Sequence, residues 1–373
     1  MRKNFFLVLA AVLQALAATT LDAQTNSELS GRVTFEGRAM PGVVVTAESP
    51  ALQGRLVTTT NAKGDYVIKF LPAGDYEVSF ELESFKALTF ELRVTTTQPK
   101  FLDAVMYPEA MEGEITVSER LENVSTGAQG SETMQKSTLE KLPVARTIDS
   151  AVGLAAGTGA AGGEGPPTIS GANFNENLYT MNGVVMNENF YNQPFDMYIE
   201  DAMVETTTMT STMSAEYGRF AGGVVNMVTR SGGNAFSGSF RTSFDNESWN
   251  GTTPLTVSQV DEVNPIFEAT LGGYLWKDRL WFFLAGRDMS RSQSAQIVTP
   301  GRPDAGIPYT EGQDERRLEV KLTGSFTPNH RLMVTGTRRD VDLTNWSFWF
   351  PADENAIDPE SSRPLTAWSL NYT

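Results

Sequence analysis

Residues 215–234 read AEYGRFAGGVVNMVTRSGGN, and this stretch decides how the rest of the chain is interpreted. An aromatic residue, an arginine, an asparagine and several glycines stand close together in it. The positions concerned are Tyr217, Gly218, Arg219, Gly222, Gly223 and Asn226. So many specific residues at fixed spacing make this the most informative signal in the sequence.

A second stretch, residues 169–184, reads ISGANFNENLYTMNGV and has the form of a strand that leads into a tight turn. The Asn-Gly pair at its end is a good turn former, because both residue types tolerate a positive φ. The positions concerned are Gly171, Asn177, Tyr179, Asn182 and Gly183.

Together these stretches resemble the plug domain of TonB-dependent outer-membrane receptors. Residues 169–184 are similar to the family's N-x-Y-x-x-D-G-V turn, with Asn182 where the family commonly has Asp. Residues 215–234 are similar to the end of the plug, where the chain enters the barrel. The resemblance extends over essentially all of the chain after residue 23 and is nearest to the Oar-like receptors. It implies an α+β plug over residues 109–234.

The N-terminus has the order of a secretory signal peptide. Arg2 and Lys3 precede an apolar run from Phe5 to Ala18, and small residues end at Ala23. We therefore predict that residues 1–23 are an export signal, with a buried first helix as the alternative. No later stretch is apolar and long enough for a membrane-spanning helix, so membrane residence after export would require a β-barrel.

Residues 28–107 alternate short strands with Gly and Pro turns. Within 76–82, for example, Tyr76, Val78 and Phe80 alternate with polar residues, which predicts one buried face. The pattern favours a small all-β sandwich. It resembles the carboxypeptidase regulatory-like domain, a transthyretin-like sandwich with the carbohydrate-binding-like fold. Sugar binding is implied only through that superfamily.

The segment after the sandwich contains a short acidic and β-branched run that resembles a TonB box. Such a box adds as a strand to the edge of a partner's sheet through main-chain hydrogen bonds. The alternative is that this run is simply the first strand of the next domain. Its residues are Glu114, Ile115, Thr116, Val117 and Ser118.

From residue 235 to 373 the sequence predicts the start of an antiparallel transmembrane β-barrel. Leu318, Val320 and Leu322 alternate with charged or polar residues, as in strands with one lipid-facing side. Trp276 and Trp281 flank the turn at 277–278, which suggests an interfacial aromatic girdle. A soluble sandwich is the alternative. We expect about six strands, whereas plugged transporters use about 22, so the chain is expected to be a fragment or a truncated product.

Composition excludes several classes of function. The formal charge of -16 argues against a nucleic-acid partner. The chain has no cysteine and one histidine, so thiolate metal sites and most metalloenzyme schemes are excluded, and we expect no cofactor, no metal site and no enzymatic activity.

The resemblance implies energised uptake across the outer membrane of a Gram-negative-type bacterium. The implied partners are TonB with its inner-membrane complex, outer-membrane lipid, and an extracellular ligand such as a carbohydrate or a peptide. The alternative functions are a surface adhesion or structural protein that works through the sandwich, and an enzyme acting on peptide or glycan, for which the residues are missing. The motifs leave the ligand and the oligomeric state open.

Overall fold

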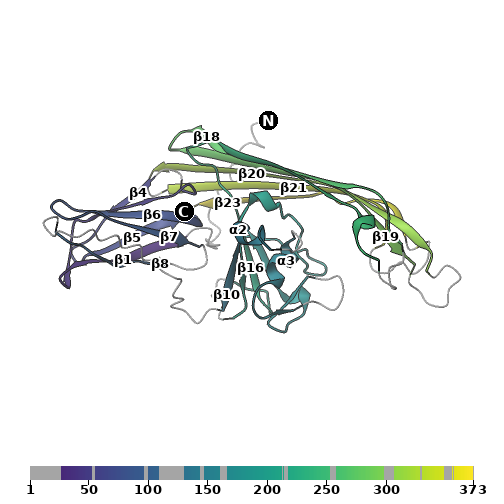
Figure 1. Ribbon diagram of the computed structural model, residues 1–373, viewed down its shortest axis with the longest axis horizontal. Coiled ribbons are helices and arrows are strands. Elements are labelled where there is room, and N and C mark those ends of the chain that lie inside the picture. The colour runs from purple at the N-terminus through teal and green to yellow at the C-terminus, as the bar shows by residue number, and fades with distance from the viewer. Residues whose placement is uncertain are drawn as a thin grey trace, which may run out of the picture.

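The chain folds as three groups of strands that follow one another in sequence (Figure 1). We call them the sandwich (27–108), the plug (130–233) and the wall (237–372). The computed structural model describes residues 27–52, 55–95, 100–108, 130–142, 147–159, 166–211, 213, 217–252, 258–297, 306–327, 330–347, 355 and 357–372. The predicted signal peptide and the predicted TonB box lie outside the described residues.

The sandwich packs two sheets around one apolar core. The first contains β1 (Ser27–Phe35), β2 (Arg38–Ala39), β5 (Asp65–Leu71), β8 (Lys100–Phe101) and β9 (Ala104–Val105). The second has the order β4 (Arg55–Thr59), β3 (Val44–Glu48), β6 (Gly74–Glu81), β7 (Leu88–Val94). Phe80 lies in this core, edge-to-face with Tyr66 and Phe90 at ring-centroid distances of 5.5 and 5.7 Å. The alternation in β6 is the one that the sequence predicts.

The plug is built on a five-stranded mixed sheet. Its order is β10 (Ser131–Gln135), β15 (Met203–Met209), β16 (Val224–Thr229), β13 (Leu178–Met181), β14 (Val184–Val185). The other elements are α2 (Lys136–Leu139), α3 (Ile148–Gly153), the ribbon β11 (Thr158–Gly159) with β12 (Thr168–Ile169), and 3-10 turns η1 (Phe174–Glu176) and η2 (Glu200–Ala202). All residues of β13 and β16 are buried, so these two parallel neighbours form the centre of the plug.

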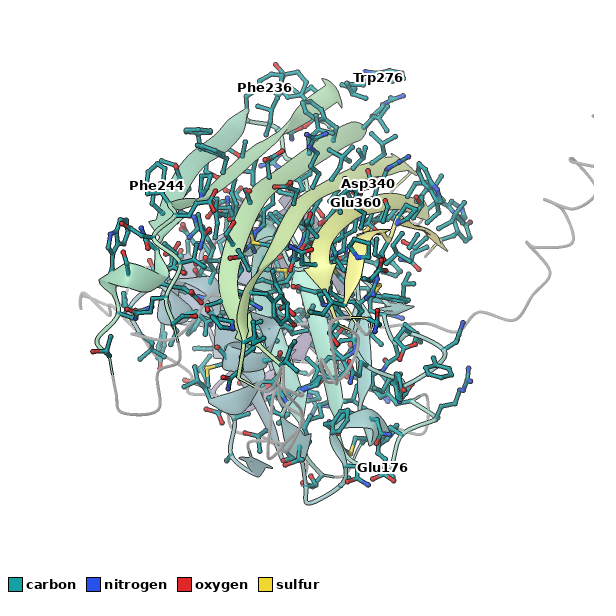
Figure 2. All side chains as sticks on the ribbon, turned by 90° about the vertical axis from the view of Figure 1, so that its right-hand side faces the viewer. Glu176, Phe236, Phe244, Trp276, Asp340 and Glu360 are labelled. Carbon is teal, nitrogen blue, oxygen red and sulfur yellow. The ribbon has the colours of Figure 1, made fainter. Side chains whose placement is uncertain are left out.

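The wall is one antiparallel sheet that curves over the plug (Figure 2). Its strands are β17 (Ser237–Asp245), β18 (Asn264–Trp276), β19 (Leu280–Gln296), β20 (Pro308–Thr327), β21 (His330–Trp346), β22 (Asp358–Ser362) and β23 (Leu365–Tyr372), and a 3-10 turn η3 (Glu247–Trp249) follows β17. This is one strand more than expected, because β22 and β23 both pair with β21.

The two faces of the wall differ in chemistry. Phe240, Leu271 and Leu318 on the outer face are 73%, 46% and 51% exposed. Side chains at alternate positions of β20, among them Glu319 and Lys321, are buried against the plug. The sheet therefore has an apolar outer face and a polar inner face, as the alternation predicts. Within the described residues, no helix is long and apolar enough to cross a membrane.

The girdle prediction is wrong for one of its tryptophans. Trp276 is exposed on the outer side, with Phe236 and Phe244 (Figure 2). Trp281 instead points inward, is only 1% exposed, and donates its indole N–H to Asn234 Oδ1 at 2.8 Å. The period of two places Trp281 on the face that packs against the end of the plug.

Candidate functional site

The site that sequence motifs and structure both single out is the contact between plug and wall. Asn182 and Gly183 form the turn between β13 and β14, with φ values of +50° and +82°. The Asn182 side chain donates to Thr229 Oγ1 at 2.8 Å and accepts from the Thr229 N–H at 3.1 Å. It therefore joins the ends of the two central plug strands as well as forming the predicted turn.

The same asparagine also contacts the wall. Lys321 on β20 donates from Nζ to Asn182 Oδ1 at 3.0 Å and to the Thr229 carbonyl at 2.8 Å. Glu319, two residues earlier on the strand, accepts a hydrogen bond from the Thr229 hydroxyl. We call Asn182, Thr229, Glu319 and Lys321 the Asn182 cluster; all four side chains are buried.

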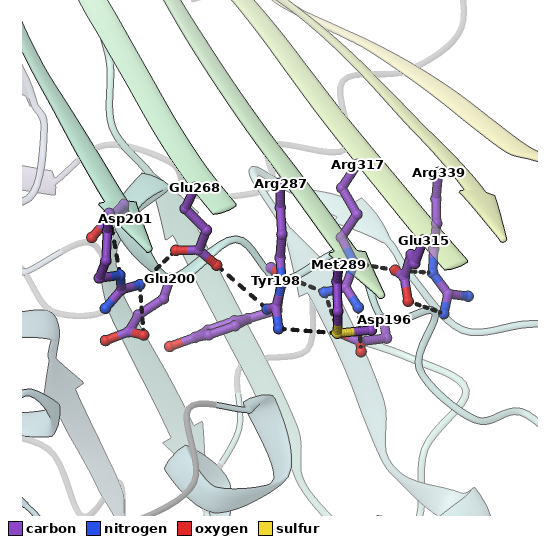
Figure 3. Close-up of polar contacts among 11 residues, drawn as sticks. Asp196, Tyr198, Glu200, Asp201, Glu268, Arg287, Met289, Glu315, Arg317 and Arg339 are labelled. Atoms are coloured by element: carbon purple, nitrogen blue, oxygen red, sulfur yellow. Dashed lines mark hydrogen bonds and ion pairs between the residues drawn. The ribbon is translucent and has the colours of Figure 1, made fainter. Parts of the chain in front are cut away.

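A second cluster surrounds Arg317 (Figure 3). Its guanidinium donates to both oxygens of Asp196 on the plug, at 2.9 and 2.7 Å, and to the Tyr198 carbonyl. It also pairs with Glu315 on its own strand. Arg339 on β21 binds Glu315 from the other side, at 2.7 and 3.1 Å. Glu315 thus has two arginine partners, and Arg317 connects the wall to the plug.

A third cluster lies at the first wall strands. Arg241 on β17 contacts Glu200 of the plug at 2.7 Å and also pairs with Glu268 on β18. Asp201 accepts from Lys136 on α2 at 2.9 Å and lies 3.5 Å from Arg241. In Figure 3 this group and the Arg317 cluster form one row along the inner face of the wall.

The three clusters explain how the plug is positioned. Ion pairs out of water add little net stability, because desolvation offsets their attraction. Removing one partner is costly, because it leaves the other charge buried. The clusters therefore specify one arrangement of plug and wall, and a plug that moves has to break several of them together.

The predicted plug residues gather at two ends of β13 and β16. At one end Asn177, fully buried, donates to the Pro167 carbonyl and accepts from the Gly223 N–H, both at 3.0 Å. Gly222 and Gly223 pack against Asn177 and Ile169 there. The Asn182 cluster forms the opposite end.

Of the other predicted residues, two lie in these strands and the rest lie near them. Tyr179 is buried in the plug core, and its N–H donates to Asn187 Oδ1 at 2.8 Å. Asn226 accepts from the Thr180 hydroxyl at 3.0 Å, and Tyr217 packs against the cluster of Leu178, Met209 and Val224. Gly171 lies in a turn with a φ of +77°, and Gly218 and Arg219 lie in the loop before β16, where φ is +62° at Arg219. These residues contribute chain direction.

Sequence reasoning missed the charged residues that contact across the interface. The wall residues that contact the plug are Arg241, Arg317, Glu319 and Lys321, with Glu268, Glu315 and Arg339 beside them on the wall, and those on the plug are Asp196, Glu200 and Asp201. A signal was present on β20, where charges recur at every second position from Glu315 to Lys321. Their partners on the plug carry no such pattern.

One plug carboxylate is expected to make plug stability pH-dependent. Burial, with the charge of Asp196 as the second cause, raises the pKa of Asp149 on α3. A raised carboxyl pKa means that stability is full below the ordinary value of about 4 and is lost as the pH rises through the folded-state value. Asp149→Asn should therefore increase thermal stability at pH 7 and change nothing at pH 3. Equal melting temperatures at pH 7 would contradict this.

Comparisons with known proteins agree with this geometry. Residues 28–107 match the family description of the carboxypeptidase regulatory-like domain. The TonB-dependent transporter Oar of Myxococcus xanthus is 32% identical over 297 residues, which cover 72% of this chain and 26% of that protein. The chain thus spans about a quarter of the length of the curated relative it matches.

Two solved receptors share the fold. The siderophore receptor PirA from Acinetobacter baumannii is 19% identical, with a TM-score of 0.50 over 65% of this chain and 37% of that one. A mutant of the ferric enterobactin receptor from Pseudomonas aeruginosa is 14% identical, with a TM-score of 0.51 over 65% and 38%. At these identities the likeness concerns the fold alone, and it confirms the predicted mainly β class.

Proposed function

The chain belongs to the TonB-dependent outer-membrane receptors, in the Oar-like group with a carboxypeptidase regulatory-like domain, and we propose that it serves energised uptake. The observation that carries this proposal is the row of ion pairs that connects the inner face of the wall to the plug. Such contacts hold a plug in one position, and a plug that moves has to break several of them together. The proteins that it resembles are a transporter and receptors, which supports a role in transport.

In the proposed mechanism a ligand binds from outside and TonB acts from inside. TonB takes up residues 114–118 as an added strand and pulls on the plug. The plug contacts then open, and the ligand passes along the inner face of the wall. The exposed apolar face of β17–β23 meets outer-membrane lipid in this arrangement.

We propose that four segments of the chain have separate roles. Residues 1–23 direct export, 28–107 form the accessory sandwich, 109–234 form the plug and 235–373 begin the barrel. The sandwich is a spacer or binding module. A carbohydrate or a peptide is the ligand class that we propose for the receptor as a whole.

The proposed TonB box can be tested with one backbone change. Ile115→Pro removes an N–H that an added strand needs, so binding of the purified periplasmic domain of TonB to the full-length receptor should be lost. Ile115→Val keeps the N–H and the β-branched side chain and should bind normally. If the proline variant binds TonB as well as the parent does, the box lies elsewhere and residues 114–118 are the first strand of the plug.

A further inference from the structure

The sandwich lies against the end of the wall at which β20 turns into β21 (Figure 1). A cavity of about 400 Å³ marks the place where sandwich, plug and wall meet. Its lining includes Ser49 and Pro50 from the sandwich, Thr229 and Ser231 from the plug, and Lys321 and Arg331 from the wall. The sandwich is therefore in contact with both partners of the plug–wall interface.

A hydrogen bond joins sandwich and wall. Arg331 at the start of β21 donates from Nη1 to the Phe70 carbonyl at 3.2 Å. Phe70 has a φ of +64°, a conformation that bulky residues rarely adopt and that persists only where surrounding structure imposes it. The end of β5 is thus held in an unusual backbone conformation at the point of contact with the wall.

Two further approaches connect the sandwich to the plug. A Cβ atom at Gly233, where the plug ends, would lie 3.7 Å from the Pro50 carbonyl oxygen. On β8 burial lowers the pKa of Lys100, and the charge of Glu205, a buried residue of β15, acts on that pKa in the opposite direction. The sandwich thus approaches the plug near Gly233 and at the β15 strand.

The character of the interface indicates reversible docking. Charged side chains such as Asp75 and Lys321 line the cavity beside apolar ones such as Met333, and a space of about 400 Å³ leaves room for water between the parts. The two sheets of the sandwich bury their apolar faces against each other in one core, so the sandwich does not need the contact with the wall in order to fold. Interfaces between domains of one chain are typically of this releasable kind.

The short segment between the sandwich and the proposed box limits how far TonB can pull the box before the contact between sandwich and wall comes under tension. Residues 109–113 separate the sandwich from the proposed box, and five residues span at most about 18 Å at full extension. TonB can therefore draw the box only a short way before tension reaches the docked sandwich. Any longer movement of the plug requires the sandwich to leave.

We propose that the sandwich is a clasp, which holds the end of the plug against the wall and has to undock before TonB can extend the plug. This inference rests on the proposed function, because it takes residues 114–118 as the point of pulling. In the resting receptor the Arg331–Phe70 contact and the approach of Pro50 to Gly233 keep the clasp closed. Undocking is then the first step of plug movement.

Docking itself is tested by crosslinking in the full-length receptor. Residues 1–373 contain no cysteine, so Pro50→Cys and Gly233→Cys supply the only two thiols of this part, and any cysteine elsewhere in the full-length receptor is replaced by serine. A short bifunctional methanethiosulfonate should join them in resting outer membranes. The control pair, Glu48→Cys with Arg55→Cys, joins register partners inside the sandwich and should react whether or not the sandwich is docked. Reaction of the control pair alone overturns the proposal.

The clasp is tested by pulling the purified receptor through the periplasmic domain of TonB in a single-molecule force experiment. An initial rupture should precede plug extension, and Arg331→Met should lower its force severalfold or remove it. Arg338→Met, on the exposed side of the same strand, should leave it unchanged. Lys100→Met changes the sandwich side of the same interface. It replaces Arg331→Met as the test variant if Arg331→Met folds poorly.

The outcomes separate the clasp from the function on which it rests. If TonB holds the receptor but the first rupture is the same in the parent, Arg331→Met and Lys100→Met, the clasp is wrong and the proposed function stands. If TonB forms no tether with any variant, the proposed function fails and the clasp fails with it.

Discussion

Arg317→Gln is expected to loosen the plug strongly, whereas the same change at the neighbouring Arg316 should have almost no effect. Arg317 is buried and supplies the two hydrogen bonds to Asp196 and one partner of Glu315. Glutamine leaves the buried Glu315 with Arg339 as its one arginine partner, and it removes both hydrogen bonds to Asp196, whose side chain is 46% exposed. Breaking a fully buried pair from one side costs about 3–5 kcal/mol, and because Arg339 remains on Glu315 we expect a loss toward the lower end of that range.

Arg316 provides the matched control. It lies on the opposite face of β20, its side chain is 82% exposed, and it pairs with Asp288, which is 61% exposed. Exposed pairs contribute about 0–1 kcal/mol, so Arg316→Gln should behave like the parent. The strand, the residue type and the substitution are the same, and only the face differs.

The measurement is the rate at which a protease digests the plug of the purified receptor. Arg317→Gln should be digested much faster than the parent, and Arg316→Gln at the parental rate. Equal rates for all three proteins would mean that the Arg317 cluster does not hold the plug. Equal acceleration in both variants would mean that the wall itself is damaged.

Arg316 and Arg317 show which part of the plug–wall contact the sequence predicts and which part it does not. Alternation along β20 predicts that Arg316 and Arg317 lie on opposite faces, because side chains alternate strictly along a strand. It does not predict Asp196, which lies 121 positions earlier in the chain and in no regular element. Pairing between distant segments depends on how the plug sits against the wall, and no local pattern encodes that.

Asn182 illustrates the same limit within a recognised motif. The Asn-Gly turn could be predicted from local backbone preferences, and the structure confirms the positive φ at both residues. That the same side chain accepts a hydrogen bond from Lys321 could not be predicted, since a turn former needs no partner. The girdle prediction was wrong for Trp281 for a related reason: an aromatic residue beside a turn can lie on either face, and the register of β19 places Trp281 inward, where Asn234 accepts its N–H.

The glycines of the plug motif lead to the second large effect. Gly223→Ala should disrupt the plug, because a Cβ there would lie 2.3 Å from Ile169 Cγ2 and 2.7 Å from the Met209 carbonyl oxygen. The second of these is backbone of β15, paired with β16 next to the glycine, so the strands would have to separate. Overpacking a close contact of this kind typically costs about 1–3 kcal/mol and sometimes more.

Gly218→Ala is the control in the same motif, since a Cβ at 218 meets nothing within 4 Å. We expect Gly223→Ala to yield receptor with a protease-sensitive plug and little of it in the outer membrane, and Gly218→Ala to match the parent in both respects. Thermal unfolding of the purified proteins should rank them in the same order. A tolerated alanine at 223 would show that the plug sheet can shift there, and the glycine would then serve the path of the chain and not its packing. Sensitivity at 218 as well would point to a surface that binds a partner, because the fold leaves that position open.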